Sequence, residues 1–187
     1  MQDESPDAVD ARLRQRAVNG SSQAFHELVD RHADRLFRLA VSLVGGVPDA
    51  EDVLQETFLG AFRGLEKFEA RSSVKTWLTK ILVRQAALRR RQNRRSKTEP
   101  LAGESAERPH REIEEIGATE RSGRKIDLMA ALQMLSAEHR EILSLREFEQ
   151  LSYEEIADVL QVSRGTVESR LYRARAELRN ALQAYSP

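Results

Sequence analysis

The chain contains no cysteine, which excludes disulfide bridges, thiolate zinc sites and thiol redox switches. Glycine and proline are scarce in its 187 residues, and aromatic residues make up only 5%. Together with 32% charged residues, this composition is typical of an all-helical protein with one or two small domains. The net charge is zero, which taken alone argues against a polyanionic partner such as nucleic acid.

Long hydrophobic runs are also missing. The longest, over residues 39–47, contains Ser42, Gly45 and Gly46 and is far too short to cross a bilayer. The first residues are acidic and polar, unlike a secretory signal. We therefore expect a cytoplasmic protein with no membrane insertion of its own.

Sequence motifs for catalysis are absent. There is no glycine-rich phosphate loop, no G-x-S-x-G motif and no pair of carboxylates in an apolar setting. His26 and His32 are six residues apart, which is off the i, i+4 face of a helical zinc motif, so we expect satisfied or solvent-facing histidines. The sequence therefore predicts no enzymatic activity, no metal and no cofactor.

A helix-turn-helix pattern occupies residues 152–182. Ser152 and Glu155 form a capping box at the start of a short helix, and Ser163 caps a longer one after a tight turn. The longer helix has an apolar stripe that we expect to face the core, made of Val167, Leu171, Ala174, Leu178 and Leu182. Another side presents Thr166, Ser169, Arg170 and Arg173, flanked by Tyr172. Such a helix suits the DNA major groove, although arginines on a bundle helix can equally form a solvated face.

Helical periodicity predicts further helices on both sides of a break in the middle of the chain. Upstream, four helices over residues 7–18, 21–44, 49–68 and 73–95 predict one compact bundle. Downstream, helices over residues 126–135 and 137–149 would pack against the helix-turn-helix. The fold class is therefore predicted as all-α, with two small helical domains, residues 1–96 and 126–187.

Charge is strongly segregated along the chain. Residues 84–97 contain seven arginines and lysines and no acid, whereas residues 99–120 contain seven glutamates and only two arginines. The basic run predicts contact with DNA phosphates, although it would also serve as a solubilising helix end. Residues 97–125 lack sustained periodicity, and we expect them to form a flexible acidic linker.

Two segments of the chain resemble bacterial sigma factors. Residues 49–58 (DAEDVLQETF), followed by residues 65–69 (LEKFE), are similar to the helix by which sigma factors bind core RNA polymerase. Residues 152–157 (SYEEIA) and 165–175 (GTVESRLYRAR) are similar to the domain that reads the −35 promoter element. Two domains in this order, without others, point to the extracytoplasmic-function (ECF) class.

The resemblance implies roles for residues of the first domain. Asp52, Gln55 and Glu56 would dock on the clamp coiled coil of the polymerase β′ subunit. Phe62 would either support that contact or belong to the core. Contacts with the −10 element, including a loop that captures a flipped base, would come from Arg71, Ser72, Ser73, Lys75, Trp77, Lys80, Arg84 and Gln85.

The resemblance also implies roles for the second domain and a set of partners. Ser169, Tyr172 and Arg173 would face the −35 element, with Arg173 able to take a guanine edge bidentately. The residues expected to contact phosphates are Arg164, Thr166 and Arg170. The implied partners are core RNA polymerase (through its β′ and β subunits), promoter DNA and an anti-sigma factor.

Two other functions fit parts of the sequence. A stand-alone helix-turn-helix regulator would bind palindromic DNA as a dimer and would make no use of Asp52, Gln55 or Glu56. A helical adaptor without DNA would tolerate Arg173→Ala with all partner binding intact. We predict an ECF-type sigma factor, because it accounts for both segments.

Overall fold

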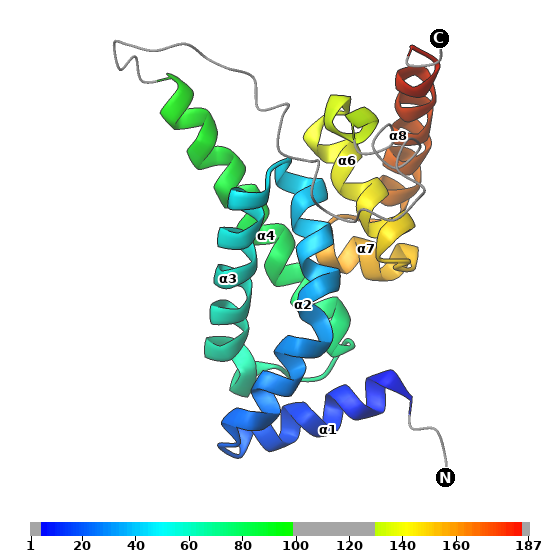
Figure 1. Ribbon diagram of the computed structural model, residues 1–187. Coiled ribbons are helices and arrows are strands. Elements are labelled where there is room, and N and C mark those ends of the chain that lie inside the picture. The colour runs from blue at the N-terminus through cyan, green and yellow to red at the C-terminus, as the bar shows by residue number, and fades with distance from the viewer. Residues whose placement is uncertain (1–4, 99–129, 185–187) are drawn as a thin grey trace, which may run out of the picture.

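The computed structural model describes residues 5–98 and 130–184, and within them the protein is all-α, without strands, as predicted (Figure 1). The N-terminal part contains α1 (Pro6–Val18), α2 (Ser22–Val44), α3 (Val47–Gly64), the 3₁₀ helix η1 (Leu65–Lys67) and α4 (Val74–Thr98). The C-terminal part contains α6 (Ala137–Leu143), the π-helix η2 (Ser144–Phe148), α7 (Tyr153–Leu160) and α8 (Arg164–Ala184). Residues 130–134 are also helical.

The ends of the helices follow local signals, some of which the sequence reading misplaced. α2 begins after Ser21, whose Oγ accepts from the Ala24 amide at 3.3 Å, and ends at Gly45 in the left-handed region (φ 85°). The predicted third helix, residues 49–68, is wrong at both ends. α3 already includes Pro48 in its first turn. Proline is tolerated there because the amides of a first turn make no hydrogen bond within the helix. At its other end α3 stops at Gly64, and η1 follows.

The predicted linker lies almost entirely outside the described residues. α4 continues past the predicted end at Arg95 to Thr98, so the first two linker positions are helical. Residues 99–125 and the beginning of the next predicted helix, residues 126–129, are not described.

α2 is the central helix of the N-terminal part, with α1, α3 and α4 packed around it (Figure 1). Its buried side carries leucines at helical spacing: Leu28, Leu36, Leu39 and Leu43. α1 is attached by buried Asp10, which contacts Arg31 Nε and His32 Nε2, both at 2.8 Å. His32 is thus a satisfied, buried histidine, and His26 is exposed, as expected for both.

The helix-turn-helix forms as predicted. The two hydrogen bonds of the capping box join Ser152 and Glu155, at 3.2 and 2.8 Å, and Ser163 Oγ accepts from the Thr166 amide at 3.2 Å. The apolar stripe of α8 is buried at Val167, Leu171 and Ala174 and partly buried at Leu178. Leu182 is 37% exposed, so its assignment to the core was wrong: α8 extends beyond the helices that cover it (Figure 1).

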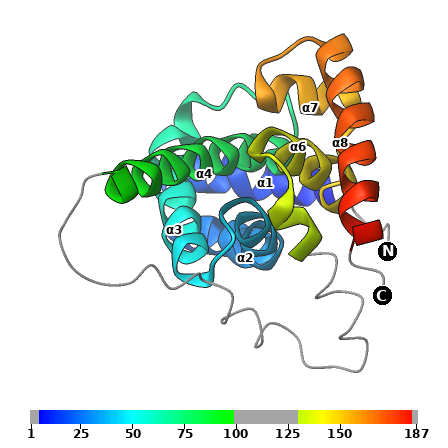
Figure 2. The ribbon, with the colours of Figure 1, turned by 90° about the horizontal axis from the view of Figure 1, so that it is seen from above.

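The C-terminal part packs against the N-terminal part. α7 lies on α4, and α6 and η2 lie on α2 (Figure 2). Buried apolar residues form one continuous cluster through both parts. Within this interface, Ser42 Oγ hydrogen-bonds to Ser144 Oγ at 3.1 Å, and both serines are fully buried. None of the helices in the described ranges combines the length and apolar character that a membrane crossing requires.

Candidate nucleic-acid interface

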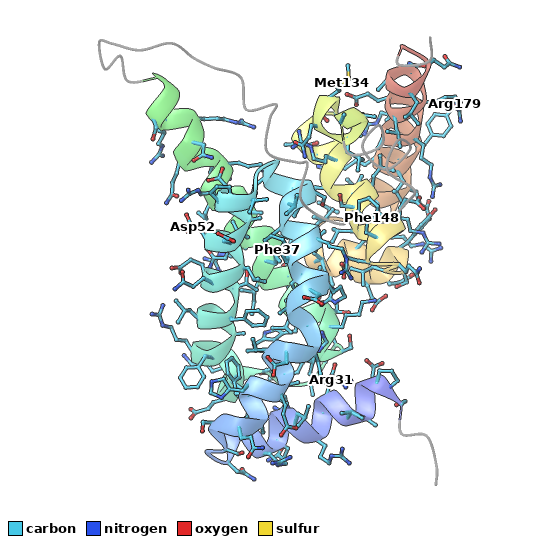
Figure 3. All side chains as sticks on the ribbon, in the orientation of Figure 1. Arg31, Phe37, Asp52, Met134, Phe148 and Arg179 are labelled. Atoms are coloured by element: carbon cyan, nitrogen blue, oxygen red, sulfur yellow. The ribbon has the colours of Figure 1, made fainter. Side chains whose placement is uncertain are left out.

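The residues predicted to dock on polymerase lie on one exposed face of α3. Asp52, Gln55 and Glu56 are all exposed, at the i, i+3, i+4 spacing of helix neighbours. Phe62 is 61% exposed, with its ring edge-on to Phe25 at 5.2 Å between centroids, so it belongs to the surface and not to the core. Figure 3 shows Asp52 on the side of the molecule away from the C-terminal part.

A groove of about 300 Å³ runs between this face of α3 and α4. Its lining residues are Asp52, Val53, Gln55, Glu56, Gln85, Leu88, Arg89 and Gln92. Arg89 pairs with Asp52 Oδ2 at 2.9 Å and with Asp49 Oδ1 at 2.6 Å. Hydrogen bonding to Asp49 raises the pKa of Arg89. Arg89 therefore fixes one of the predicted docking residues from the neighbouring helix.

Sequence reasoning missed two apolar residues beside this face. Leu59 lies two helical turns after Asp52 on α3 and is 39% exposed. Leu88 on α4 is 42% exposed. The helical spacing of Leu59 from Asp52 and Gln55 was a signal that could have identified it. Arg89 was read only as part of the basic run.

The loop before α4 holds the first of the predicted −10 residues. Ser73 caps α4, because its Oγ accepts from the Thr76 amide at 3.1 Å. Arg71 is exposed and pairs with Glu69 at 2.7 Å. Ser72 is partly buried. A hydroxyl-bearing turn with an exposed arginine suits contact with a single-stranded nucleotide.

Trp77 is half-buried and supports this loop. Its ring stacks on Phe68 at 4.6 Å between centroids. Arg14 of α1 donates to the Phe68 carbonyl at 3.1 Å and lies over the same ring at 5.6 Å. No sequence pattern indicates this role of Arg14, because it lies 54 positions from Phe68.

The remaining predicted −10 residues do not share one surface. Lys75 donates to the backbone carbonyl of Glu149 at 2.7 Å, and Lys80 pairs with Asp158 at 2.9 Å, so both face the C-terminal part. Arg84 is exposed. Gln85 lies in the groove beside the docking residues. Burial, together with the nearby Arg35, lowers the pKa of Lys75.

The basic run at the end of α4 is partly engaged by protein carboxylates. Arg89 contacts the α3 acids, and Arg90 pairs with Glu141 of α6 at 2.9 Å. Arg84, Arg91 and Arg95 are exposed. Fewer residues of the basic run are therefore available to DNA phosphates than the sequence suggested, because Arg89 and Arg90 already bind carboxylates.

Three predicted −35 residues project together from α8. Ser169, Tyr172 and Arg173 are exposed, and Tyr172 is 78% exposed. Arg173 Nε donates to the Ser169 carbonyl at 3.3 Å, which holds its side chain along the helix. A tyrosine this exposed adds little to the packing of the fold, and its ring is free to contact a binding partner.

The three predicted phosphate contacts of this helix have protein partners. Arg164 pairs with Glu154 at 2.6 Å and with Glu168 at 3.0 Å. Thr166 Oγ1 contacts the capping Ser163 hydroxyl at 2.8 Å. Arg170 lies 3.8 Å from Glu138. Exposed ion pairs contribute little, so a phosphate can replace these carboxylates at small cost.

A second groove, of about 330 Å³, lies beside Tyr172. Tyr153, Glu168, Leu171, Tyr172, Arg175, Ala176 and Arg179 line it. Arg175 pairs with Glu147 at 3.0 Å. Arg175 and Arg179 are four residues apart and therefore lie on one side of α8, which the sequence reasoning did not use to place them together in this groove. Among the described residues, no group of three or more His, Asp or Glu side chains would hold a metal ion.

Comparison with known proteins connects both interfaces to one family. Residues 28–96 match the family described as Sigma-70 region 2, and residues 125–178 match Sigma-70, region 4. The first match contains α3 and all but the last two residues of α4, and the second contains α7 and α8 as far as residue 178. The two segments singled out in the sequence therefore fall in two separate family matches.

Curated proteins match over nearly the whole chain. The RNA polymerase sigma-H factor of Pseudomonas aeruginosa is 35% identical, covering 93% of this chain and 94% of its own. The ECF RNA polymerase sigma factor SigE of Mycolicibacterium smegmatis is 39% identical, covering 87% of this chain and 63% of its own. The ECF RNA polymerase sigma-E factor of Haemophilus influenzae is 32% identical, with coverages of 93% and 95%.

Solved structures agree with this assignment. CnrH in complex with the cytosolic domain of CnrY aligns with a TM-score of 0.69 at 28% identity, covering 95% of this chain and 99% of that one. The sigma factor RpoE in complex with the anti-sigma factor NepR from Bartonella quintana aligns with a TM-score of 0.65 at 30% identity, covering 85% and 96%. The chain therefore belongs to the ECF family of RNA polymerase sigma factors.

Proposed function

We propose that this sigma factor docks on core RNA polymerase through the exposed face of α3 and reads the −10 and −35 elements through α4 and α8. Sigma factors are transcription initiation factors and not enzymes, and they direct polymerase to promoters. In this proposal residues 1–96 act at polymerase and the −10 element, and residues 126–187 act at the −35 element.

One observation carries the proposal. A single chain presents an exposed acid–amide face on α3 and an exposed reading face on α8. The first has carboxylates and an amide that suit a basic protein surface, with Arg89 holding Asp52 in place. The second has the tyrosine, serine and arginine that suit base edges in the major groove.

The −10 element would be bound by the loop before α4 and by the first half of that helix. Arg71, Ser72 and Ser73 would surround an unstacked base, with Trp77 as the wall behind them. Unstacking costs a few kcal/mol, which contacts in such a pocket must offset. Lys75, Lys80 and Arg84 would contact phosphates, while Gln85 lies close enough to the docking groove to serve either surface.

The −35 element would be read by α8. Arg173 with a guanine edge would contribute about 1–3 kcal/mol of discrimination between bases. Ser169 and Tyr172 would contact neighbouring positions, and Arg164, Thr166 and Arg170 would bind phosphates after leaving their present partners.

An anti-sigma factor is the regulatory partner that we propose for this chain. The RpoE structure that it resembles was solved with an anti-sigma factor, and the CnrH structure with a cytosolic protein domain. We further propose that the protein acts in the cytoplasm, with polymerase, and needs no metal or cofactor.

Run-off transcription tests the proposal. Purified core polymerase and genomic promoter fragments are combined with the wild type or with Gln55→Ala/Glu56→Ala. We expect specific initiation by the wild type, and a large loss with the double substitution because it removes the centre of the α3 face. A control, Gln23→Ala/Glu27→Ala, removes the same two side-chain types from another helix, α2, and should leave initiation unchanged.

The stand-alone regulator makes the opposite prediction. If the wild type neither binds core polymerase nor starts transcription, yet binds palindromic DNA as a dimer, the sigma assignment of these surfaces is wrong. If both double substitutions weaken initiation equally, the α3 face has no special role.

A further inference from the structure

Part of the surface proposed to bind −10 DNA is in contact with acidic groups of the C-terminal part. The N-terminal residues in these contacts, here named the covered face, are Arg35, Lys75, Thr76 and Lys80. Their C-terminal partners, here named the acidic edge, are Glu149, Glu155 and Asp158. They meet where α7 and the end of η2 pack on α4 and α2 (Figure 2).

Glu149 holds two cations of the covered face at once. Its carboxylate pairs with the guanidinium of Arg35, and its backbone carbonyl accepts from Lys75 Nζ at 2.7 Å. Glu149 is only 2% exposed, so the contact exists only while the two parts are together. A glutamate at this position would otherwise be a solvated side chain at the end of a helix.

Two further contacts continue the same surface along α4. Thr76 Oγ1 donates to Glu155 Oε1 at 2.9 Å, while Oε2 of Glu155 stays in the capping box of α7. One turn on, Lys80 Nζ pairs with Asp158 Oδ1 at 2.9 Å. The carboxylates of α7 therefore lie along α4 as a row of anionic oxygens.

Phosphate oxygens would make the same contacts. Lysine, arginine and hydroxyl groups bind carboxylate and phosphate oxygens with the same donor geometry. Lys75 and Lys80 are both engaged by protein acceptors, so DNA phosphates would compete with these acceptors for the two ammonium groups. Carboxylates and DNA are competing ligands of one surface.

We infer that the acidic edge is an intramolecular occupant of the covered face, which DNA must displace for the −10 element to bind. The inference rests on the proposed function, because that function assigns Lys75 and Lys80 to −10 DNA. Within the −10 set it concerns Lys75 and Lys80, since Arg71 and Arg84 stay exposed. The residues proposed for polymerase (Asp52, Gln55, Glu56 and Phe62) and for −35 bases (Ser169, Tyr172 and Arg173) are exposed as well.

The contacts are of a kind that a polyanion can replace. Arg35 Nε and Nη2 are buried without a hydrogen-bond partner among the described residues. Their desolvation costs free energy, so the Arg35–Glu149 pair stabilises the contact between the two parts less than a fully hydrogen-bonded pair would. Burial lowers the pKa of Arg35 to about 10, so it keeps its charge at neutral pH but at a cost in desolvation. Lys80 and Asp158 are both well exposed, and salt screens their attraction.

The first test weakens the acidic edge. Glu149→Gln/Asp158→Asn removes two negative charges that pair with the covered face, whereas the control Asp34→Asn/Glu147→Gln removes two from exposed side chains outside the acidic edge. The probe is a fluorescent single-stranded oligothymidylate, titrated by anisotropy with the full chain alone at low salt. We expect the first variant to bind about fivefold tighter than the control. Equal affinity of the two variants would overturn the inference.

The second test holds the two parts together in one protein. Because the chain has no cysteine, Ser42→Cys/Ser144→Cys places its two thiols where hydroxyls lie 3.1 Å apart, and diamide would join them. We expect the oxidised protein to bind oligothymidylate at least several-fold more weakly than the same protein after reduction, while its affinity for core polymerase is unchanged. Reversal by reductant shows that the variant is folded.

Two results of this second test would overturn the inference: a disulfide that does not form, or an oxidised protein that binds DNA as tightly as the reduced one. Failure of the proposed function would be seen separately, as absence of run-off transcription by the wild type. The oligothymidylate titrations do not depend on that assay, so the two failures remain distinguishable.

Discussion

Replacing Asp10 with asparagine should loosen α1 from the rest of the N-terminal part. The Asp10 carboxylate is almost completely buried and accepts from His32 and Arg31, both at 2.8 Å. Breaking a buried ion pair costs about 3–5 kcal/mol. Arg31 is 38% exposed, so water screens its share, and asparagine keeps one acceptor, which reduces the expected loss to about 2–3 kcal/mol.

In a chain of this size that loss corresponds to a fall in Tm of roughly 4–12 °C. Thermal unfolding followed by far-ultraviolet circular dichroism at pH 7 would measure it. Asp34→Asn, an exposed aspartate on α2, is the matched control and should change Tm little. A fall no larger than that of the control would refute the role given to Asp10.

The same substitution carries a pH dependence of known sign. Burial would raise the pKa of Asp10, but hydrogen bonds from His32 and Arg31 outweigh it, and the pKa lies below its usual value. A carboxyl whose folded pKa is lowered stabilises the fold above its ordinary pKa of about 3.9, and this contribution is lost as pH falls through the folded value. The stability difference between wild type and Asp10→Asn should be full at pH 7 and should shrink below about pH 4.

Three further substitutions test other contacts. Ser152→Ala removes the N-cap of α7 and should lower the free energy of unfolding by about 1 kcal/mol in urea titrations, an effect that Ser152→Asp should largely avoid. Leu171→Ala opens a cavity beneath α8, where the leucine is 1% exposed, and should cost about 2–5 kcal/mol by the same measurement. Arg89→Gln releases Asp52 and should weaken binding to immobilised core polymerase by up to about tenfold, whereas the exposed Arg91→Gln should not.

The features that the sequence predicted correctly depend on residues close together in the chain. The capping box of Ser152 and Glu155, the exposed side of α8 and the face of Asp52, Gln55 and Glu56 all follow from helix periodicity and caps. Each can be deduced from a window of a few turns. That is why the fold class and the helix-turn-helix were accessible without coordinates.

The features that could not be predicted join distant positions. Arg14 reaches the Phe68 carbonyl, and Arg35 reaches Glu149 across 114 positions. A periodic pattern assigns a residue to the buried or exposed side of its own helix but does not indicate which other helix covers it. For the same reason Leu182 fitted the apolar stripe of α8, although within the described residues it is 37% exposed.

The π-helix η2 has a consequence for insertions and deletions. At its end the amide of Glu149 donates to the Ser144 carbonyl at 3.2 Å. This bond spans five residues, whereas an α-helical bond spans four. Deleting one residue from residues 144–148 would allow an ordinary α-helical turn and would rotate whatever follows by about 100° around the helix axis. Glu149 would then point away from Arg35 although every side chain of the pair was still encoded. A single codon lost or gained here can thus separate or join the two halves of the molecule, a far smaller genetic step than rebuilding an interface residue by residue.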